Sequence, residues 1–450
     1  MAQKSFRLIV TVTALAFMVA QLDVTIVNIA LPEIALTFHV PVSTLQWVVD
    51  AYTIAFAVLL LSAGSLSDLL GATRIFQLGM VIFMIASIGC GFAGSALSLI
   101  LFRVVQGIGA ATMIPSSLAL LNLAFAHDHA TRARAVGFWT AAGSAAMATG
   151  PIIGGLLIHA SSWRFIFFVN VPLCLAGILY SLRLDAEKPG SHEKKFDTAG
   201  QIVWMLSVTI LIAAIIEWSK LGFTNPFIYG GLSFSILLLI LFVQIEKRSL
   251  NPMLPLHLFQ SSTFNVLLVL GGILNCNYYG ALFVLSLYLQ TTLHYSSMAA
   301  GLAFIPLTAG FVMSNLISGR IINKFGIQKP ILVGLVLFAA GFAGLFIVDA
   351  NTPYWQLCLP FLTIPFGMGL AVPAMTNGVL AGVDKALSAT ASAALNTIRQ
   401  TAGAIGVAVF GAMTIGGPIA NIHAIMITAI SAILLSLFTF GLTLKYIRNH

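Results

Sequence analysis

Residues 8–32 read LIVTVTALAFMVAQLDVTIVNIALP, a run in which Asp23 is the single charged side chain. A helix of this length rises about 38 Å, which exceeds the roughly 30 Å hydrocarbon core of a bilayer. The run therefore predicts a membrane-spanning helix. Because it lacks the short apolar segment and cleavage site of a secretory signal, we expect the span to be retained.

A shortage of charge extends along the whole chain. Of its 450 residues, 59% are apolar and 8% are charged, and the mean hydropathy is +1.02. About a quarter of the residues of a soluble domain are charged. The composition therefore excludes a soluble fold and predicts an all-α integral membrane protein.

Apolar runs of about 20 residues, the length of a membrane span, recur fourteen times. They lie near residues 8–32, 44–64, 74–94, 97–122, 134–159, 163–183, 197–218, 225–245, 263–291, 297–321, 329–349, 354–381, 388–415 and 421–445. An even number of spans puts both termini on the same side of the membrane. An odd number is the main structural alternative.

The basic residues indicate which side that is. Seventeen of the 21 Lys and Arg residues fall in loops on the side of the termini, and only Arg164 and Lys220 fall in loops on the other side. Because basic residues gather in cytoplasmic loops, we expect cytoplasmic termini in the inner (plasma) membrane of a bacterial cell. This distribution explains the net charge of +8 without a nucleic-acid partner.

The chain also shows a linker and an internal repeat. Residues 184–196 have the polar composition of a linker, and the pattern G-x-L-x-D-x-x-G at 64–71 recurs as G-x-I-x-N-x-x-G at 319–326. Internal repeats are common in transporters. We therefore expect an N-terminal six-helix bundle (1–183), a cytoplasmic linker (184–196), two inserted helices with a following loop (197–262) and a C-terminal six-helix bundle (263–450).

Asp23 and Arg103 lie inside spans of the N-terminal half, where a charge is costly and marks a functional site by default. Asp23 has no basic residue within helical reach, so its partner must come from another helix. Its carboxyl group suits proton coupling or recognition of a cation, and a permanent structural ion pair is the alternative. Arg103 lies about one turn inside the fourth span, where it either takes part in transport or extends to the membrane surface.

Two further charged residues inside predicted spans, Asp50 and Arg399, each allow two interpretations. Asp50 lies near the outer end of the second span beside aromatic residues, so it is either a gating or substrate residue or an interfacial acid. Arg399 lies near the middle of the thirteenth span and serves either transport or a structural network. The polar residues Asn275, Tyr278 and Tyr279 would be costly against lipid, so we expect them at the cavity or at a helix contact.

The fifth span is rich in small residues. It contains Gly137, Gly150, Pro151, Gly154 and Gly155. Small residues allow helices to approach closely, and a buried proline removes a backbone hydrogen bond. The fifth span therefore predicts a pliable seam between helices.

Nothing in the sequence indicates catalysis. Walker, HExxH and Gly-x-Ser-x-Gly patterns are absent, and the cysteines fall in apolar runs without metal-ligand spacing. We therefore expect no enzymatic activity, no metal and no cofactor.

Taken together, these residues resemble the major facilitator superfamily, and within it the fourteen-helix drug:proton antiporters of the multidrug efflux type. The resemblance covers nearly the whole chain. The stretch LDVTIVNIALP at 22–32 is similar to the family's helix-1 signature, whose aspartate is implicated in proton coupling or cation recognition. Arg103, Gln106, Gly107 and Gly109 are similar to the helix-4 motif, whose arginine is implicated in proton transfer.

Three further segments carry the resemblance. The loop after the second span is similar to a superfamily motif that latches the two halves on the cytoplasmic side. Here the latch would consist of Gly64, Asp68, Gly71, Arg74 and Arg134, although Leu69, Ala72 and Thr73 stand where basic residues are common. The fifth span resembles the antiporter motif of exporters, and Asn396, Arg399 and Gln400 continue the pattern into the thirteenth span.

The sequence thus predicts a proton-coupled secondary exporter, an antiporter, of amphipathic and cationic drugs or toxic compounds that works by alternating access. It would act as a monomer in the lipid bilayer, with protons and a small-molecule substrate as its partners. A dedicated metabolite exporter of the same fold is the first alternative. A proton symporter or uniporter that imports a small polar substrate, and a channel, are the others.

Overall fold

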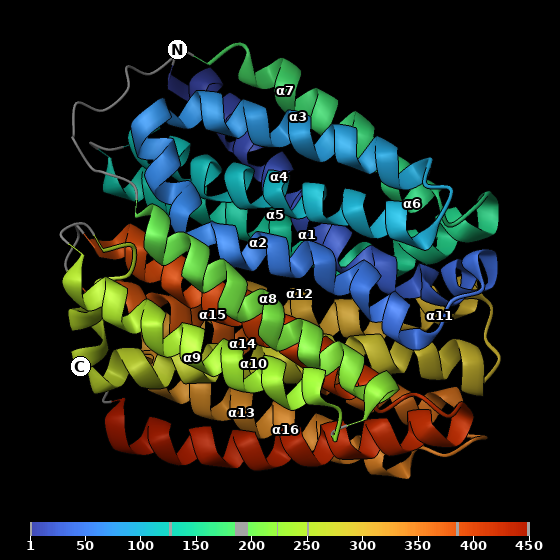
Figure 1. The fold of residues 1–450 in the computed structure, drawn as a ribbon. Helices are drawn as coiled ribbons and strands as arrows, with labels where there is room; N and C mark the ends of the chain where they lie inside the picture. Colours follow the sequence, from blue (N-terminus) through green and yellow to red (C-terminus); the bar gives the residue numbers. More distant parts are fainter. Residues whose placement is uncertain are drawn as a thin grey trace.

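The computed structural model describes residues 2–125, 128–184, 197–222, 224–249, 252–383 and 387–447. Within these ranges every regular element is a helix, and the long helices run roughly side by side (Figure 1). The predicted all-helical class is confirmed. Residues 185–196 of the predicted linker lie outside the described ranges.

The helices of the N-terminal part form the upper group in Figure 1, coloured from blue to the green of α7. They are α1 (Ala2–Phe38), α2 (Val42–Leu70), α3 (Ala72–Gly91), α4 (Ala96–Ala124), α5 (His129–Ala160), α6 (Phe165–Phe168) and α7 (Asn170–Ser181). Helix α1 packs on α4, α5 and α7, while α4 also packs on α2 and α3. Helices α1 and α4 therefore lie at the centre of this group.

The helices of the C-terminal part form the lower group in Figure 1, coloured yellow to red. They are α10 (Ser262–Leu287), α11 (Ser297–Ala303), α12 (Ile305–Phe325), α13 (Gln328–Ala343), α14 (Tyr354–Ala381), α15 (Ser388–Ala412) and α16 (Pro418–Tyr446). Helix α10 packs on α14, α15 and α16, and a short π-helical turn, Tyr288–Thr292, continues it. The two groups meet where α2 packs on α15 and where α5 packs on α11 and α12.

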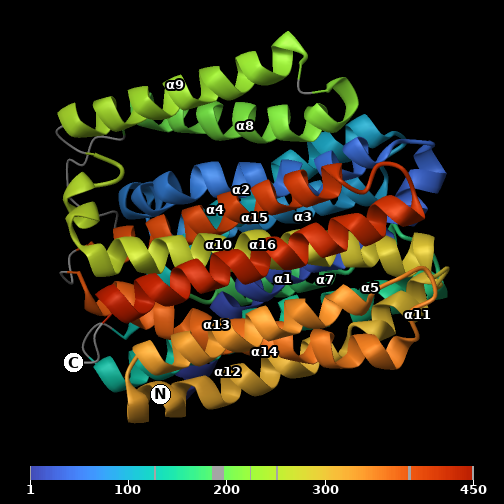
Figure 2. The same ribbon diagram turned by 90° about the horizontal axis from the view of Figure 1, so that it is seen from below.

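Helices α8 (Thr198–Leu221) and α9 (Pro226–Arg248) form a separate layer on one side of the molecule (Figure 2). Helix α8 packs on both α2 and α15, so it covers the line where the two groups meet. The indole Nε1 of Trp47 donates to Glu217 Oε1 over 3.0 Å, and Gln201 Nε2 donates to the Val58 carbonyl over 2.8 Å. Helix α9 packs chiefly on α8 and exposes large apolar side chains along its length.

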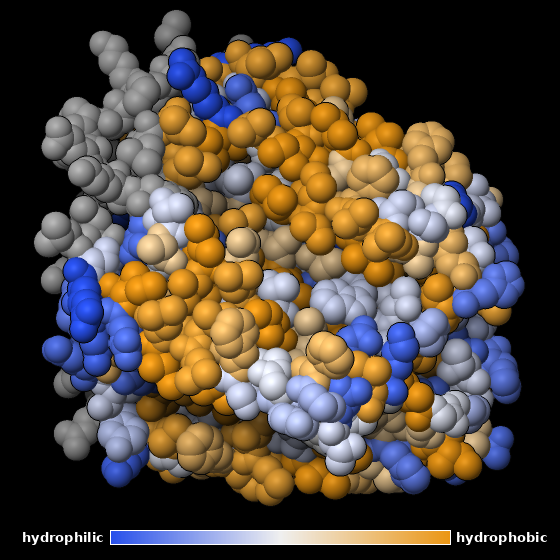
Figure 3. Space-filling view, in the orientation of Figure 1, coloured by the Kyte–Doolittle hydropathy of each residue, from blue (hydrophilic) through white to orange (hydrophobic). Residues whose placement is uncertain are grey.

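Twelve helices in the described ranges are long and apolar enough to cross a membrane. The other two predicted spans correspond to the short, apolar α6–α7 segment and to α15, which the polar residues Asn396, Arg399 and Gln400 make less apolar. Fourteen spans, and cytoplasmic termini, therefore stay predictions. The face in Figure 3 is largely hydrophobic, with hydrophilic residues mainly toward its left and right edges, as expected of a multi-pass membrane protein.

In both halves the internal repeat ends its helix at a glycine with positive φ. Gly71 ends α2 with φ of 94° and Gly326 ends α12 with φ of 72°, values that favour glycine. Their N–H groups donate to the carbonyls of Ser67 and Ile322, each four residues earlier. The two motif glycines therefore have the same physical role, which is to end one helix and turn the chain into the next.

A close helix contact gives a test of this packing. At Gly406 on α15, an added Cβ atom would overlap the Cys276 carbonyl of α10, whereas at Gly441 on α16 it would meet open space. We expect Gly406→Ala to lower the free energy of unfolding by about 1–3 kcal/mol and Gly441→Ala to change it by less than about 1 kcal/mol. Apparent melting temperatures of the purified proteins measure both effects, and equal melting temperatures would contradict the packing of α10 on α15.

Candidate functional site

Asp23 lies inside the N-terminal group of helices. Its side chain has no exposed surface, and its Oδ2 forms an ion pair with the Arg103 guanidinium of α4, which is also fully buried. The predicted partner from another helix is therefore Arg103. The alternative in which Arg103 extends to the membrane surface is wrong, because this side chain points into the group of helices.

Two amide side chains complete the contacts of the carboxylate. Asn170 Nδ2 of α7 donates to Asp23 Oδ1 over 2.9 Å, and Gln106 Nε2 of α4 donates to the same oxygen over 3.2 Å. Gln106 Nε2 also lies 2.8 Å from the Ser87 hydroxyl oxygen of α3. Three helices besides α1 thus supply polar groups around one carboxylate.

The guanidinium of Arg103 is equally well surrounded. Its Nε donates to the Val48 carbonyl over 3.0 Å and its NH1 group donates to Gln106 Oε1 over 2.9 Å. The ring of Tyr52 lies 4.5 Å below the guanidinium carbon, in a cation–π contact. Because both charges are buried, the removal of either partner would leave an uncompensated charge in an apolar environment.

Asp50 has a different environment. It is fully buried on α2, and neither carboxylate oxygen accepts a hydrogen bond from any described residue. The interpretation of Asp50 as an interfacial acid in contact with water is therefore wrong. One turn earlier on the same helix, Gln46 donates to the carbonyls of Val407 and Ala408 over 3.2 and 2.7 Å, so Asp50 lies close to the place where α2 meets α15.

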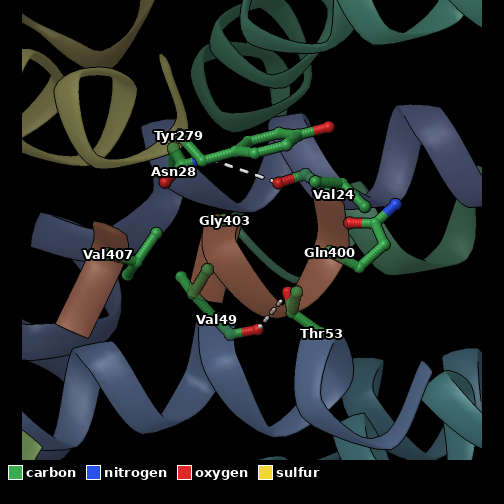
Figure 4. Close-up of a pocket in the computed structure, with 8 residues that line it drawn as sticks. All are labelled: Val24, Asn28, Val49, Thr53, Tyr279, Gln400, Gly403 and Val407. Atoms are coloured by element: carbon green, nitrogen blue, oxygen red, sulfur yellow. Dashed lines mark hydrogen bonds between the residues drawn. The ribbon is translucent and has the colours of Figure 1, made fainter. Parts of the chain in front are cut away.

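A narrow pocket with a cavity volume of about 10 Å³ lies between the two groups of helices (Figure 4). It is lined by Val24, Asn28, Val49, Thr53, Tyr279, Gln400, Gly403 and Val407. None of these side chains carries a charge. The cavity is far smaller than known ligand pockets, which begin near 300 Å³, so a substrate would enter only when the two groups move apart. Its apolar walls with a few amide and hydroxyl groups suit an amphipathic molecule.

Of the polar residues predicted in the ninth span, only Tyr279 lines this pocket. Its hydroxyl donates to Met147 Sδ of α5 over 3.5 Å and so reaches across to the N-terminal group. Tyr278 is buried and contacts the Tyr279 ring edge-on, while Asn275 donates to the Gly271 carbonyl of its own helix. Tyr278 and Asn275 are therefore packing residues in this conformation.

The thirteenth predicted span contributes Gln400 to the pocket rather than Asn396. Asn396 Nδ2 donates to the Ser392 carbonyl one turn earlier on α15. Arg399 is half-buried near the middle of α15, and among the described residues it forms neither a hydrogen bond nor an ion pair. Sequence reasoning thus identified Arg399 but not Gln400 as a candidate.

The small residues of α5 lie where helices approach closely. A Cβ atom at Gly154 would lie 3.0 Å from Ile26 of α1, and one at Gly155 would lie 2.7 Å from the Ser297 carbonyl of α11. Gly150 similarly faces Thr25, whereas Gly137 is exposed and has no neighbour within 4 Å of an added Cβ. The seam therefore runs from Gly150 to Gly155, and it joins α5 to helices of both groups.

The latch predicted at the second loop stays a prediction. Gly64 lies within α2 and Gly71 ends it, while Arg74 is exposed near the start of α3. The guanidinium of Arg134 stacks near Phe6 and Phe138, each at 5.7 Å. The side chain of Asp68 lies outside the described part of the structure.

The sequence profile described as Major Facilitator Superfamily matches residues 13–407. A methylenomycin A resistance protein of Bacillus subtilis is 35% identical over 90% of this chain and 86% of its own length. The multidrug resistance protein Stp of Mycobacterium tuberculosis is 33% identical over 89% of this chain and 74% of its own. A crystal structure of a POT family transporter superposes with a TM-score of 0.73 at 12% identity, covering 98% of this chain and 96% of that one, which shows a shared fold.

The ion pair can be tested with a double-mutant cycle. We expect Arg103→Gln to lower the free energy of unfolding by about 3–5 kcal/mol, because it leaves the Asp23 carboxylate buried without a counter-charge. Asp23→Asn should cost less, since Arg103 keeps Val48, Gln106 and Tyr52. The double variant should be more stable than Arg103→Gln alone, as measured by apparent melting temperature. Strictly additive losses would show that the two side chains are not coupled.

Proposed function

The chain belongs to the major facilitator superfamily and is a membrane transporter of small molecules, and from that premise we propose that it is a proton-coupled exporter of amphipathic drugs or toxic compounds. The observation that carries the proposal is the separation of two sites. The Asp23 carboxylate and its counter-charge are sealed inside the N-terminal group of helices, while the pocket between the groups is uncharged and partly apolar. Proton binding and substrate binding would thus occupy different places.

Alternating access would follow from rocking of 1–183 against 263–450 about this pocket. Several hydrogen bonds cross between the groups at or beyond the pocket, toward the turn between α1 and α2. Ser286 donates to the Asn28 carbonyl over 2.7 Å, and Gln290 donates to the Ile29 carbonyl over 3.1 Å. With the termini in the cytoplasm, that end faces outward, and this conformation is closed to the outside.

Protons would drive the conformational change by binding to the Asp23 carboxylate of the ion pair with Arg103. Protonation of Asp23 removes its charge, weakens its hold on Arg103 and changes how α1, α4 and α7 pack around them. Asp50 would take up a second proton, because a buried carboxylate without any partner is costly unless it is neutral. When the α2–α15 contact opens, water would reach Asp50 and allow its proton to leave.

A dedicated exporter of one compound is the second candidate. One relative, the methylenomycin A resistance protein, bears the name of a single antibiotic. A narrow range of exported compounds would distinguish it from a multidrug pump.

The decisive variant for proton coupling is Asp23→Asn. In proteoliposomes with an imposed pH gradient, we expect the wild type to drive uphill flux of an amphipathic dye and the variant to lose it, with the fold retained. Asp349→Asn, the same change in the exposed segment before α14, serves as the control and should transport normally. Uphill flux by the Asp23→Asn protein would be incompatible with this role for Asp23.

A further inference from the structure

Arg399 carries a charge near the middle of α15 that no described residue neutralises. Its Nε atom is buried and has no hydrogen-bond partner, and the guanidinium takes part in no ion pair among the described residues. Such a group is costly within a membrane and usually faces a cavity or a partner. A half-buried guanidinium between helices is therefore a place where an anionic ligand would bind favourably.

Two glycines make room for the side chains of Arg399 and Tyr279. An added Cβ atom at Gly271 of α10 would lie 3.1 Å from Arg399 Cγ, so this glycine makes space for the stem of the arginine. At Gly403, one turn after Arg399, a Cβ atom would lie 2.8 Å from the ring of Tyr279. Arg399 and Tyr279 therefore both lie at the contact between α10 and α15, where they interact electrostatically.

Arg399 does not itself line the pocket, but its neighbours on α15 do. Gly403, Gln400 and Tyr279 all line it, and Arg399 lies on the same face of α15 as Gly403, because residues four apart in a helix are neighbours. Figure 4 shows Tyr279 extending across the pocket and Gln400 pointing toward it from α15. A ligand in the pocket would therefore have the guanidinium at its border.

The acids of the membrane interior do not supply the missing counter-charge. Asp23 is already paired with Arg103, and Asp50 contacts no cation among the described residues. With Asp50 neutral, the buried pair of Asp23 and Arg103 and the half-buried Arg399 leave one net positive charge. A cationic substrate would meet this like charge, whereas an anion would neutralise it.

We propose that Arg399 binds an acidic group of the substrate, so that the exported compounds are amphipathic monoanions such as carboxylates. The guanidinium fork suits a carboxylate, to which it can donate two parallel hydrogen bonds. The apolar part of the compound would lie against Val24, Val49 and Val407. The inference rests on the proposed export function, and it replaces the expectation of cationic substrates.

Three fluorescent compounds that share a dansyl group test the charge preference. They are dansylglycine, an anion, dansylglycinamide, which is neutral, and dansylcadaverine, a cation. Binding is measured by equilibrium dialysis against the full-length protein in nanodiscs. We expect the wild type to bind the anion about tenfold more tightly than the neutral amide, as the loss of a charge-assisted hydrogen bond predicts, and to bind the cation most weakly.

Variants at position 399 then assign the preference to the arginine. Arg399→Gln should abolish the preference for the anion while leaving affinity for the neutral amide within about twofold, and Arg399→Lys should retain part of it. Arg320→Gln, on an exposed part of α12, is the matched control and should bind like the wild type. If Arg399→Gln does not fold, the wild-type and Arg399→Lys comparisons decide the question.

The outcomes separate the two proposals. Tightest binding of the cation, or an equal loss for all three compounds in Arg399→Gln, would overturn the anion site. Uphill flux of the same compounds in proteoliposomes under a pH gradient tests export independently. An anion preference in binding without gradient-driven flux would refute the exporter but leave the anion site standing.

Discussion

A charge inside a membrane is costly unless a neighbouring group neutralises it. In this chain the buried ion pair of Asp23 and Arg103 satisfies that requirement, because each charge neutralises the other. Four helices contribute to it, because Asn170 of α7, Gln106 of α4 and Ser87 of α3 surround a carboxylate of α1. Each of these contacts fixes the rotation of a helix about its own axis. The pair therefore specifies the arrangement of the N-terminal group as well as a site for a proton.

The C-terminal group has no equivalent pair among its described residues. Its interior charge, Arg399, stands alone, and its polar residues Asn275 and Asn396 bond to carbonyls of their own helices. Tyr279, which reaches Met147 across the interface, connects the two groups close to this unpaired charge. This difference between the two groups fits the proposed function, in which the N-terminal group binds the proton and the C-terminal group contacts the charged part of the substrate.

Movement between the groups depends on surfaces that can separate without leaving charges exposed. The contacts that cross the interface are neutral, from side-chain amide and hydroxyl groups to backbone carbonyls or between glycines such as Gly155 and Gly301. Neutral hydrogen bonds exchange with water at small net cost, so opening the interface is not prohibitive. Helix α8 lies over the α2–α15 contact, where it can shield Asp50 from lipid while the groups move.

The sequence by itself determined the class of the protein, since hydropathy fixes where helices cross a bilayer. It also identified four charged residues whose place inside predicted spans calls for a functional or structural explanation: Asp23, Asp50, Arg103 and Arg399. It also located the repeat, whose glycines end α2 and α12, each with positive φ. It could not say that Asp23 meets Arg103 and Asn170, that Asp50 is buried without a partner, or that Tyr279 rather than Tyr278 faces the pocket. Those outcomes depend on how each helix is rotated and on which helices are neighbours. Only tertiary packing decides them, because a uniformly apolar helix has no hydrophobic face to reveal its orientation.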